Sequence, residues 1–264
     1  ALIIEKLKVD VNNVTEEFDG LWCSSLADSA VRAKPDNQSV DLTTRVNSLN
    51  DILEISSKPI MFDADNGGVI EQLPYVVKNL ERLGVSALVM EDKVGSKKNS
   101  LFDDQTGSKQ DTIPNFCKKL KLAAKSRVTK DLLIVARIES FILNKGLADA
   151  VKRANAYSKS GADLILIHSK AKTAKEVFSF AKSFKRSKYY KPLVCVPSTY
   201  SNTHEKELIK NGFKVVIYAN HLLRSIYPAM LNTAKSILNN KKSKNIEDSI
   251  SSVKEIISLI KKND

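Results

Sequence analysis

The feature that most constrains the fold is a regular alternation of short apolar segments with amphipathic helical patterns. The apolar segments lack the strict period-two pattern of a strand that exposes one face, which is typical of strands buried on both faces. They comprise residues 20–26, 59–63, 86–91, 132–138, 163–168, 192–197 and 213–219. This order predicts a parallel sheet with right-handed crossovers, as a (β/α) barrel or a doubly wound sheet.

Between these segments, apolar residues recur at helical spacing. One helix is expected to end before Gly161, which suits a C-terminal cap, and Thr173 is expected to cap another. The helical faces comprise Val69, Leu73, Val76, Leu80 and Leu83 in one helix, Leu147, Val151, Ala154 and Tyr157 in a second, and Val177, Phe178, Ala181 and Phe184 in a third.

The number of predicted strands is one short of the number in a closed barrel. A TIM-type (β/α)8 barrel normally has eight strands, and seven segments are found here. Residues 1–7 have a helical pattern, so we expect the first strand of the barrel to precede residue 1 and to be missing from this sequence. The barrel is then a catalytic domain over residues 1–239.

The C-terminal region departs from the alternation. A long helix is expected from about residue 220 to 239, followed by a polar, basic linker over residues 240–245. A final helix would place Ile246, Ile250, Val253, Ile257 and Ile260 on one face. That stripe needs a partner, which is either the outside of the barrel or a neighbouring subunit.

Composition excludes several classes of protein. The apolar content of 42% is enough for a packed core, and no apolar run approaches the length of a membrane-spanning helix. No signal peptide is evident, and Cys23, Cys117 and Cys195 form neither a disulfide framework nor a metal knuckle, so we expect a cytoplasmic protein. The net charge of +12 raises a nucleic-acid hypothesis, but spread-out lysines favour a solvated surface that attracts small anions.

Polar residues gather where the predicted strands end. In parallel α/β folds this edge of the sheet carries the ligand site. The residues at these ends are Ser24 and Ser25, Asp63 and Asp65, Glu91, Arg137 and Glu139, and His168. We therefore expect a site that combines several carboxylates with an arginine, a histidine and hydroxyl groups.

The carboxylates suggest a metal ion. Asp63, Asp65 and Glu91 offer oxygen ligands only, which favours a hard cation such as Mg²⁺. The alternative for each is capping of the helix that follows, where acidic residues are common. His204 and His221 have no ligand spacing with His168, which argues against a histidine-based zinc site.

Arg137 and His168 each allow two interpretations. The Arg137 guanidinium suits a phosphate or carboxylate, but it could equally pair with Glu139. His168 could bind an oxyanion or move a proton, or it could be structural.

The stretch over residues 93–111 is long and has little periodicity. Such connections tend to be functional lids, and Lys97 and Asn99 could then reach an anion as the lid excludes water. The alternative is a tolerated surface insertion.

Five ordered motifs together resemble the phosphoenolpyruvate mutase family of the isocitrate lyase superfamily, from about Trp22 to Met230. They are Asp-Ala-Asp-Asn-Gly-Gly over 63–68, Glu-Asp-Lys-x-Gly-x-Lys-x-Asn-Ser over 91–100, Ala-Arg-Ile-Glu-Ser over 136–140, Ile-His-Ser-Lys over 167–170 and Tyr-Ala-Asn-His over 218–221. The resemblance implies an α/β barrel with the last helix swapped between subunits, in dimers or tetramers. Residues 240–264 would then pack on a neighbouring subunit.

The implied reaction interconverts phosphoenolpyruvate and 3-phosphonopyruvate, the first step of phosphonate biosynthesis. By this resemblance Asp63 binds Mg²⁺ directly, and Asp65, Glu91 and Asp36 hold its waters, with Asp36 also a member of the catalytic set. The substrate carboxylate would be bound by Ser24, Ser25 and the backbone of Leu26. The phosphoryl group would be bound by Trp22, Asn99, Arg137 and His168, with Lys97 entering on the lid.

Departures from related families narrow the choice. The isocitrate and methylisocitrate lyases carry a cysteine in the loop that here reads Lys-Val-Gly-Ser-Lys-Lys-Asn over 93–99. Phosphonopyruvate hydrolase tends to carry threonine where Asn99 stands, so Asn99 favours the mutase. Residues 33–35 are spaced differently from some members, which argues against a nucleophilic Asp36, and Ser25 replaces a glycine of some members.

Overall fold

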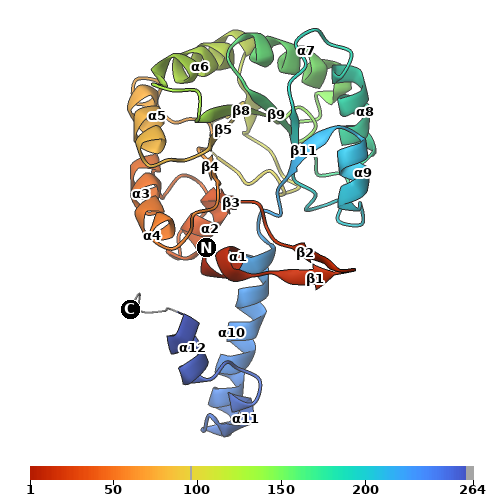
Figure 1. The fold of residues 1–264 in the computed structure, drawn as a ribbon. Helices are drawn as coiled ribbons and strands as arrows, with labels where there is room; N and C mark the ends of the chain where they lie inside the picture. Colours follow the sequence, from red (N-terminus) through yellow and green to blue (C-terminus); the bar gives the residue numbers. More distant parts are fainter. Residues whose placement is uncertain (96, 260–264) are drawn as a thin grey trace. The chain divides into compact units, whose positions relative to one another are not determined.

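The computed structural model describes residues 1–95 and 97–259, and within them it contains the predicted parallel sheet (Figure 1). The sheet has seven strands in the order β11-β10-β9-β8-β5-β4-β3, and every pair of neighbours is parallel. The strands are β3 (Leu21–Cys23), β4 (Ile60–Asp63), β5 (Ala87–Glu91), β8 (Leu133–Ile138), β9 (Leu164–Ile167), β10 (Leu193–Cys195) and β11 (Phe213–Val216). Each lies within a predicted segment.

The sheet is curled, with helices around its outer side, as Figure 1 shows. This arrangement is that of a TIM-type barrel rather than a flat doubly wound sheet. Strands β3 and β11 form the two edges of the seven-stranded sheet. The eighth strand, expected before residue 1, stays a prediction.

Both faces of the sheet are buried, which explains the lack of alternation in the sequence. On the inner face Val89, Val135, Leu166 and Val194 belong to one apolar cluster. Their neighbours along each strand belong to the larger cluster that packs against the helices. Because successive side chains of a strand point to opposite faces, apolar residues are required at every position.

Five helices follow strands of the sheet: α5 (Leu73–Arg82), α6 (Ile113–Ser126), α7 (Gly146–Lys159), α8 (Lys175–Phe184) and α9 (Glu205–Lys210). Three details of the predicted patterns are wrong. Leu147, expected on the buried face of α7, is exposed. Val69 precedes α5 and is exposed, and α8 begins after Ala174, so Thr173 is not its N-cap. Gly161 follows the end of α7 with φ +104°, as a C-terminal glycine does.

Several short elements were not predicted. The strands β1 (Val9–Val11) and β2 (Val14–Glu16) form an exposed antiparallel ribbon, joined by Asn12 and Asn13 with positive φ. The other elements of this part are α1 (Leu2–Lys6), which was expected, α2 (Ser25–Ala30), α3 (Leu42–Asn47) and α4 (Leu49–Leu53). Helices α2, α3 and α4 are too short for apolar periodicity to predict them.

The stretch over residues 93–111 is not structureless, contrary to our expectation. Its two ends pair as the antiparallel strands β6 (Lys93–Val94) and β7 (Lys109–Gln110). We call residues 95 and 97–108, which lie between β6 and β7, the lid.

The chain divides into two compact units, residues 1–219 and 220–264. The division lies before the long helix, and the domain boundary at residue 239 stays a prediction. The second unit contains α10 (His221–Asn240), α11 (Lys244–Glu247) and α12 (Val253–Leu259).

The predicted final helix is interrupted, because Ile250 lies between α11 and α12, and Ile260 lies outside the described residues. Lys241 ends α10 in the left-handed conformation and donates its backbone N–H to the carbonyl of Ile237. None of the described residues of α10, α11 and α12 is buried. No helix in the described ranges has the length and apolarity needed to cross a membrane.

Candidate active site

The predicted site residues lie at the carboxyl ends of adjacent strands. Asp63 ends β4, Glu91 ends β5 opposite Arg137 of β8, and His168 follows β9. Asp63, Glu91 and His168 are 7%, 6% and 5% exposed, so water alone does not compensate their charges. The parallel register therefore assembles polar groups from four consecutive strands into one buried site.

The loop after β4 holds its carboxylates in a fixed conformation. Asp65 has φ +52°, and its backbone N–H donates to Oδ1 of Asp63 over 3.1 Å. Gly67 also has positive φ, and a Cβ there would come within 2.7 Å of the Met90 sulfur. From α6, the Lys119 ammonium donates to the carbonyl of Asn66 over 2.8 Å. The conformation of the loop therefore depends on Gly67 and on the Lys119 ammonium of α6.

The lid contributes Lys97 and Asn99 to one group of side chains at the site. Lys97 Nζ lies 2.5 Å from both Asp36 Oδ1 and Asp65 Oδ1, and 2.7 Å from Ser25 Oγ. Asn99 donates its amide to the other Asp36 oxygen over 3.1 Å. The lid is thus closed onto the carboxylates, and Asp36 is brought into the site.

Arg45 completes this group, and sequence reasoning missed it. Its guanidinium is 1% exposed and lies 2.8 Å from Asp28 and 3.4 Å from Asp65, over the ring of Phe62. We name the whole group the Lys97 cluster; it comprises Ser25, Asp28, Asp36, Arg45, Asp63, Asp65, Lys97 and Asn99. One sequence pattern does indicate that Arg45 is buried. It follows Leu42 by three residues and precedes Leu49 by four, so it lies on the apolar face of a helical segment.

A second group is built around Glu139, which is fully buried. Arg137 donates from Nε to Glu139 over 2.6 Å, and its Nη2 lies 3.3 Å from Glu91 and 2.9 Å from His168 Nδ1. From the lid, the Ser100 hydroxyl donates to Glu139 over 2.6 Å. The ion-pair interpretation of Arg137 is therefore confirmed. We name this group the Glu139 cluster; it comprises Glu91, Lys93, Ser100, Arg137, Glu139 and His168.

In each cluster the surroundings raise the pKa of one carboxyl group and lower that of another. Burial raises the pKa of Asp65, as does the neighbouring Asp63, and burial likewise raises the pKa of Glu91 to about 8. Burial would also raise the pKa of Glu139, but Arg137 and His168 hold it well below its usual range. Asp63 behaves like Glu139, because Arg137, Arg45 and Lys97 together outweigh its burial and lower its pKa.

Three predicted substrate-binding residues make fewer contacts. Trp22 packs against the apolar cluster on the inner face of the sheet. Ser24 precedes α2, and Leu26 lies half-buried in its first turn. Among residues 1–95 and 97–259, Trp22 and Ser24 make no side-chain hydrogen bond to either cluster. The structure thus leaves their expected role to be tested with a ligand.

The residues present fit a divalent cation that binds oxygen. In the two clusters together, six carboxylates face four basic side chains, a formal excess of two negative charges; they are Asp28, Asp36, Asp63, Asp65, Glu91 and Glu139 against Arg45, Lys93, Lys97 and Arg137. A divalent ion would neutralise this excess, and carboxylate oxygens are the ligands Mg²⁺ prefers. In the described part of the chain no three His, Cys, Asp or Glu side chains are placed to ligate one ion together. Direct ligation by a single carboxylate is compatible with that arrangement, because Mg²⁺ keeps several waters.

Comparison with known proteins agrees with this geometry. Residues 1–238 match the family model described as phosphoenolpyruvate phosphomutase. The chain is 34% identical to the phosphoenolpyruvate phosphomutase of Tetrahymena pyriformis, over 92% of this chain and 80% of that protein.

Two solved structures extend the comparison to the fold. A phosphoenolpyruvate phosphomutase from Streptomyces platensis subsp. rosaceus is 32% identical, with a TM-score of 0.86, over 92% of this chain and 83% of that one. A phosphonopyruvate hydrolase in complex with oxalate and Mg²⁺ is 34% identical, with a TM-score of 0.82, over 92% and 82%. The chain therefore belongs to the phosphoenolpyruvate phosphomutase family, within an enzyme superfamily whose members include mutases, hydrolases and lyases.

Proposed function

We propose that this protein is a Mg²⁺-dependent phosphoenolpyruvate mutase, which interconverts phosphoenolpyruvate and phosphonopyruvate by moving a phosphoryl group within one molecule. The observation that carries the proposal is the closed lid, which brings Lys97 and Asn99 onto a buried carboxylate cluster. Phosphoryl transfer through a loose transition state requires positioning and charge stabilisation, and exclusion of water favours transfer over hydrolysis.

Three carboxylates are the proposed Mg²⁺ site. Asp63 would bind the ion directly, while Asp65 and Glu91 would hold its waters. When bound, Mg²⁺ supplies a Lewis acid and a template for the carboxylate and enolate oxygens of the substrate. The buried, all-oxygen donor set and the formal excess of negative charge support this assignment.

The remaining residues bind and orient the substrate. Ser24, Ser25 and the Leu26 backbone are proposed to fix the carboxylate at the start of α2. Trp22, Asn99, Arg137 and His168 are proposed to hold the phosphoryl group. Arg137 has its guanidinium fixed by Glu139, so a planar donor is already oriented before an anion arrives.

Asp36 is better suited to hold the lid than to attack the substrate. Lys97 occupies one of its carboxylate oxygens, and the Asn99 amide donates to the other. A nucleophile needs a free oxygen beside the reacting atom. We therefore propose that Asp36 acts in the catalytic set by docking the two lid residues.

Hydrolysis of phosphonopyruvate is the second candidate, because the hydrolase structure is as similar in sequence as the Tetrahymena mutase. Asn99 favours the mutase, since its equivalent in the hydrolase tends to be threonine. Phosphorus-31 NMR of the enzyme with phosphonopyruvate and Mg²⁺ separates the two. A mutase produces the phosphoenolpyruvate signal, whereas release of inorganic phosphate with pyruvate would replace the proposal by the hydrolase.

The C-terminal unit is proposed to pack on a second copy of the chain in a dimer or tetramer. Beyond residue 239, helix α12 leaves the apolar side chains of Val253, Ile256 and Ile257 exposed. Exposed apolar side chains along one helix usually mark an interface. Light scattering should give a multiple of the 29.3 kDa chain mass, and a chain ending at residue 239 should dissociate.

The cellular setting follows from the proposed chemistry. We place the enzyme in the cytoplasm, at the first step of phosphonate biosynthesis, with a small anion as its substrate. The basic surface would attract that anion rather than bind nucleic acid.

A further inference from the structure

The two ends of the lid meet at one buried carboxylate, Asp92, which the proposed reaction does not use directly. Asp92 immediately precedes β6 and is fully buried. Its carbonyl accepts the backbone N–H of Asp111, just after β7, over 2.7 Å. Its side-chain Oδ2 accepts the Gln110 amide over 3.0 Å. The two segments that flank the lid, at β6 and at β7, are therefore held together at Asp92.

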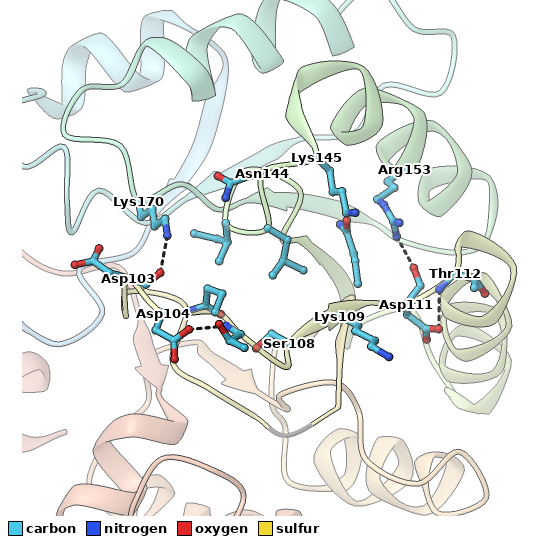
Figure 2. Close-up of a pocket in the computed structure, with 15 residues that line it drawn as sticks. Asp103, Asp104, Ser108, Lys109, Asp111, Thr112, Asn144, Lys145, Arg153 and Lys170 are labelled. Carbon is cyan, nitrogen blue, oxygen red and sulfur yellow. Dashed lines mark hydrogen bonds between the residues drawn. The ribbon is translucent and has the colours of Figure 1, made fainter.

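Helix α7 supplies two more donors to Asp92. Tyr157 donates its hydroxyl to Oδ2 over 2.7 Å, and Arg153 donates from Nη1 over 3.2 Å. Arg153 also donates to the carbonyl of Asp111 over 2.8 Å, a contact drawn in Figure 2. Residues four apart share one face of a helix, so both reach the base of the lid together. Tyr157 is fully buried and packs edge-on against Phe116.

Asp92 also connects this base to the candidate site. Its Oδ1 accepts the backbone N–H of Glu139 over 3.0 Å. Glu139 in turn orients Arg137 and His168 and accepts the hydroxyl of Ser100 from the lid. One carboxylate thus fixes both the ends of the lid and the residue on which the closed lid rests.

The lid lies between two glycines and borders a cavity. Gly95 and Gly107 stand just beyond the β6–β7 ribbon with φ +89° and +83°, conformations that glycine adopts without strain. A cavity of about 710 Å³ separates the lid from the loop over residues 142–145 (Figure 2). Gln105 Oε1 and Ser108 Oγ line it, buried but without a hydrogen bond within the described chain.

We propose that Asp92, Arg153 and Tyr157 form a fixed anchor about which the lid opens and closes, with Gly95 and Gly107 as its pivots. They act as positioning residues, because they contact Gln110 and Asp111 at the base of the lid, and Glu139, rather than the substrate. The expected effect on turnover rests on the proposed function. The effect of the anchor on lid opening can be measured without turnover. A buried charge with several donors is costly to disturb, so the base stays formed while the lid moves.

The test removes single hydrogen bonds from the anchor. Tyr157→Phe deletes one donor to Asp92 with little change in shape, and Gln110→Met removes the amide at the half-buried end of the lid. Tyr190→Phe is the matched control, since that hydroxyl donates to the Gly212 carbonyl, away from the lid. Gln110→Met keeps the test valid even if Tyr157→Phe does not fold.

Hydrogen–deuterium exchange of residues 93–111 is the primary measurement, on full-length protein with Mg²⁺ and oxalate. Exchange should be about tenfold faster or more in both anchor variants, and unchanged in Tyr190→Phe. If both anchor variants exchange at the wild-type rate, the proposal is wrong.

Turnover gives the second measurement. In the anchor variants kcat should fall by about tenfold with little change in KM, and a larger share of phosphonopyruvate should leave as inorganic phosphate, because water enters a poorly closed site. A merely destabilised enzyme would lose active molecules without changing that product ratio. If the wild-type enzyme shows no mutase activity but the exchange result holds, the anchor stands and the proposed function fails.

Discussion

The two clusters at the mouth of the sheet differ in how their charges are balanced. In the Glu139 cluster, Glu91 and Glu139 face Arg137 and Lys93, so acidic and basic groups are equal in number. In the Lys97 cluster, four aspartates are matched by two cationic members, Arg45 and Lys97. The charges of the Glu139 cluster therefore balance one another. The Lys97 cluster has an excess of negative charge, which a bound cation would neutralise.

This difference separates two tasks within one site. A balanced cluster can hold a guanidinium in a set orientation for an incoming phosphoryl group without a large cost of reorganisation. A cluster with excess carboxylates is suited to hold a metal ion, which relieves their repulsion. The proposed reaction needs both, on either side of a three-carbon anion.

The largest expected effect comes from removing the proposed metal ligand. Asp63→Ala should lower kcat by about a thousandfold or more, because the Lewis acid is lost with it. Calorimetry should show that Mg²⁺ binding is lost as well. Asp51→Ala, on the exposed side of α4, is the control and should keep both. Full activity in Asp63→Ala would refute the metal assignment.

A change in the balanced cluster should act on the substrate rather than on the metal. Arg137→Lys keeps the charge but loses the planar fork that Glu139 orients, so kcat/KM should fall by about a hundredfold. Mg²⁺ affinity, measured by calorimetry without substrate, should change little. An equal loss of Mg²⁺ affinity would mean that the two clusters do not have separate tasks.

Arg45 tests the unbalanced cluster through stability. Arg45→Met leaves the buried Asp65 and the half-buried Asp28 without their shared cation, which should lower the free energy of unfolding by about 3–5 kcal/mol. Denaturant unfolding measures the change, and Arg82→Met on the exposed side of α5 is the control. A change below about 1 kcal/mol would show that Arg45 does not compensate these carboxylates.

The smallest expected effect concerns the lid. Asn99→Ala removes one hydrogen bond to Asp36 and should lower kcat by about tenfold, with an unchanged melting temperature. Steady-state kinetics together with thermal unfolding check both parts. Unchanged turnover would remove Asn99 from the catalytic set.

Much of the fold was predictable because burial on both faces of a parallel strand leaves a clear sequence pattern. The seven strands follow from such segments, and Asp63, Glu91, Arg137 and His168 follow from their ends. The residues between strands were less predictable. Residues 93–111 have little apolar periodicity because the ribbon formed by Lys93–Val94 and Lys109–Gln110 is only two residues long on each side.

The supporting charges of the site could not be predicted from local sequence. Arg45 and Arg153 are each compensated by carboxylates distant in sequence, and only the folded chain brings those together. The same holds for Asp92, whose partners come from β7, β8 and α7. Local patterns predict which residues are buried, but not which buried charges are paired.

Anomalous diffraction from a crystal soaked with Mn²⁺ and oxalate tests most directly whether the unbalanced cluster is the metal site. We predict a single strong peak beside Asp63 in the Lys97 cluster, with oxalate bound next to it, Glu91 reaching the ion only through water, and no direct metal ligand in the Glu139 cluster. A peak among Glu91, Arg137 and Glu139 instead, or no peak in either cluster, would contradict the division of tasks proposed here.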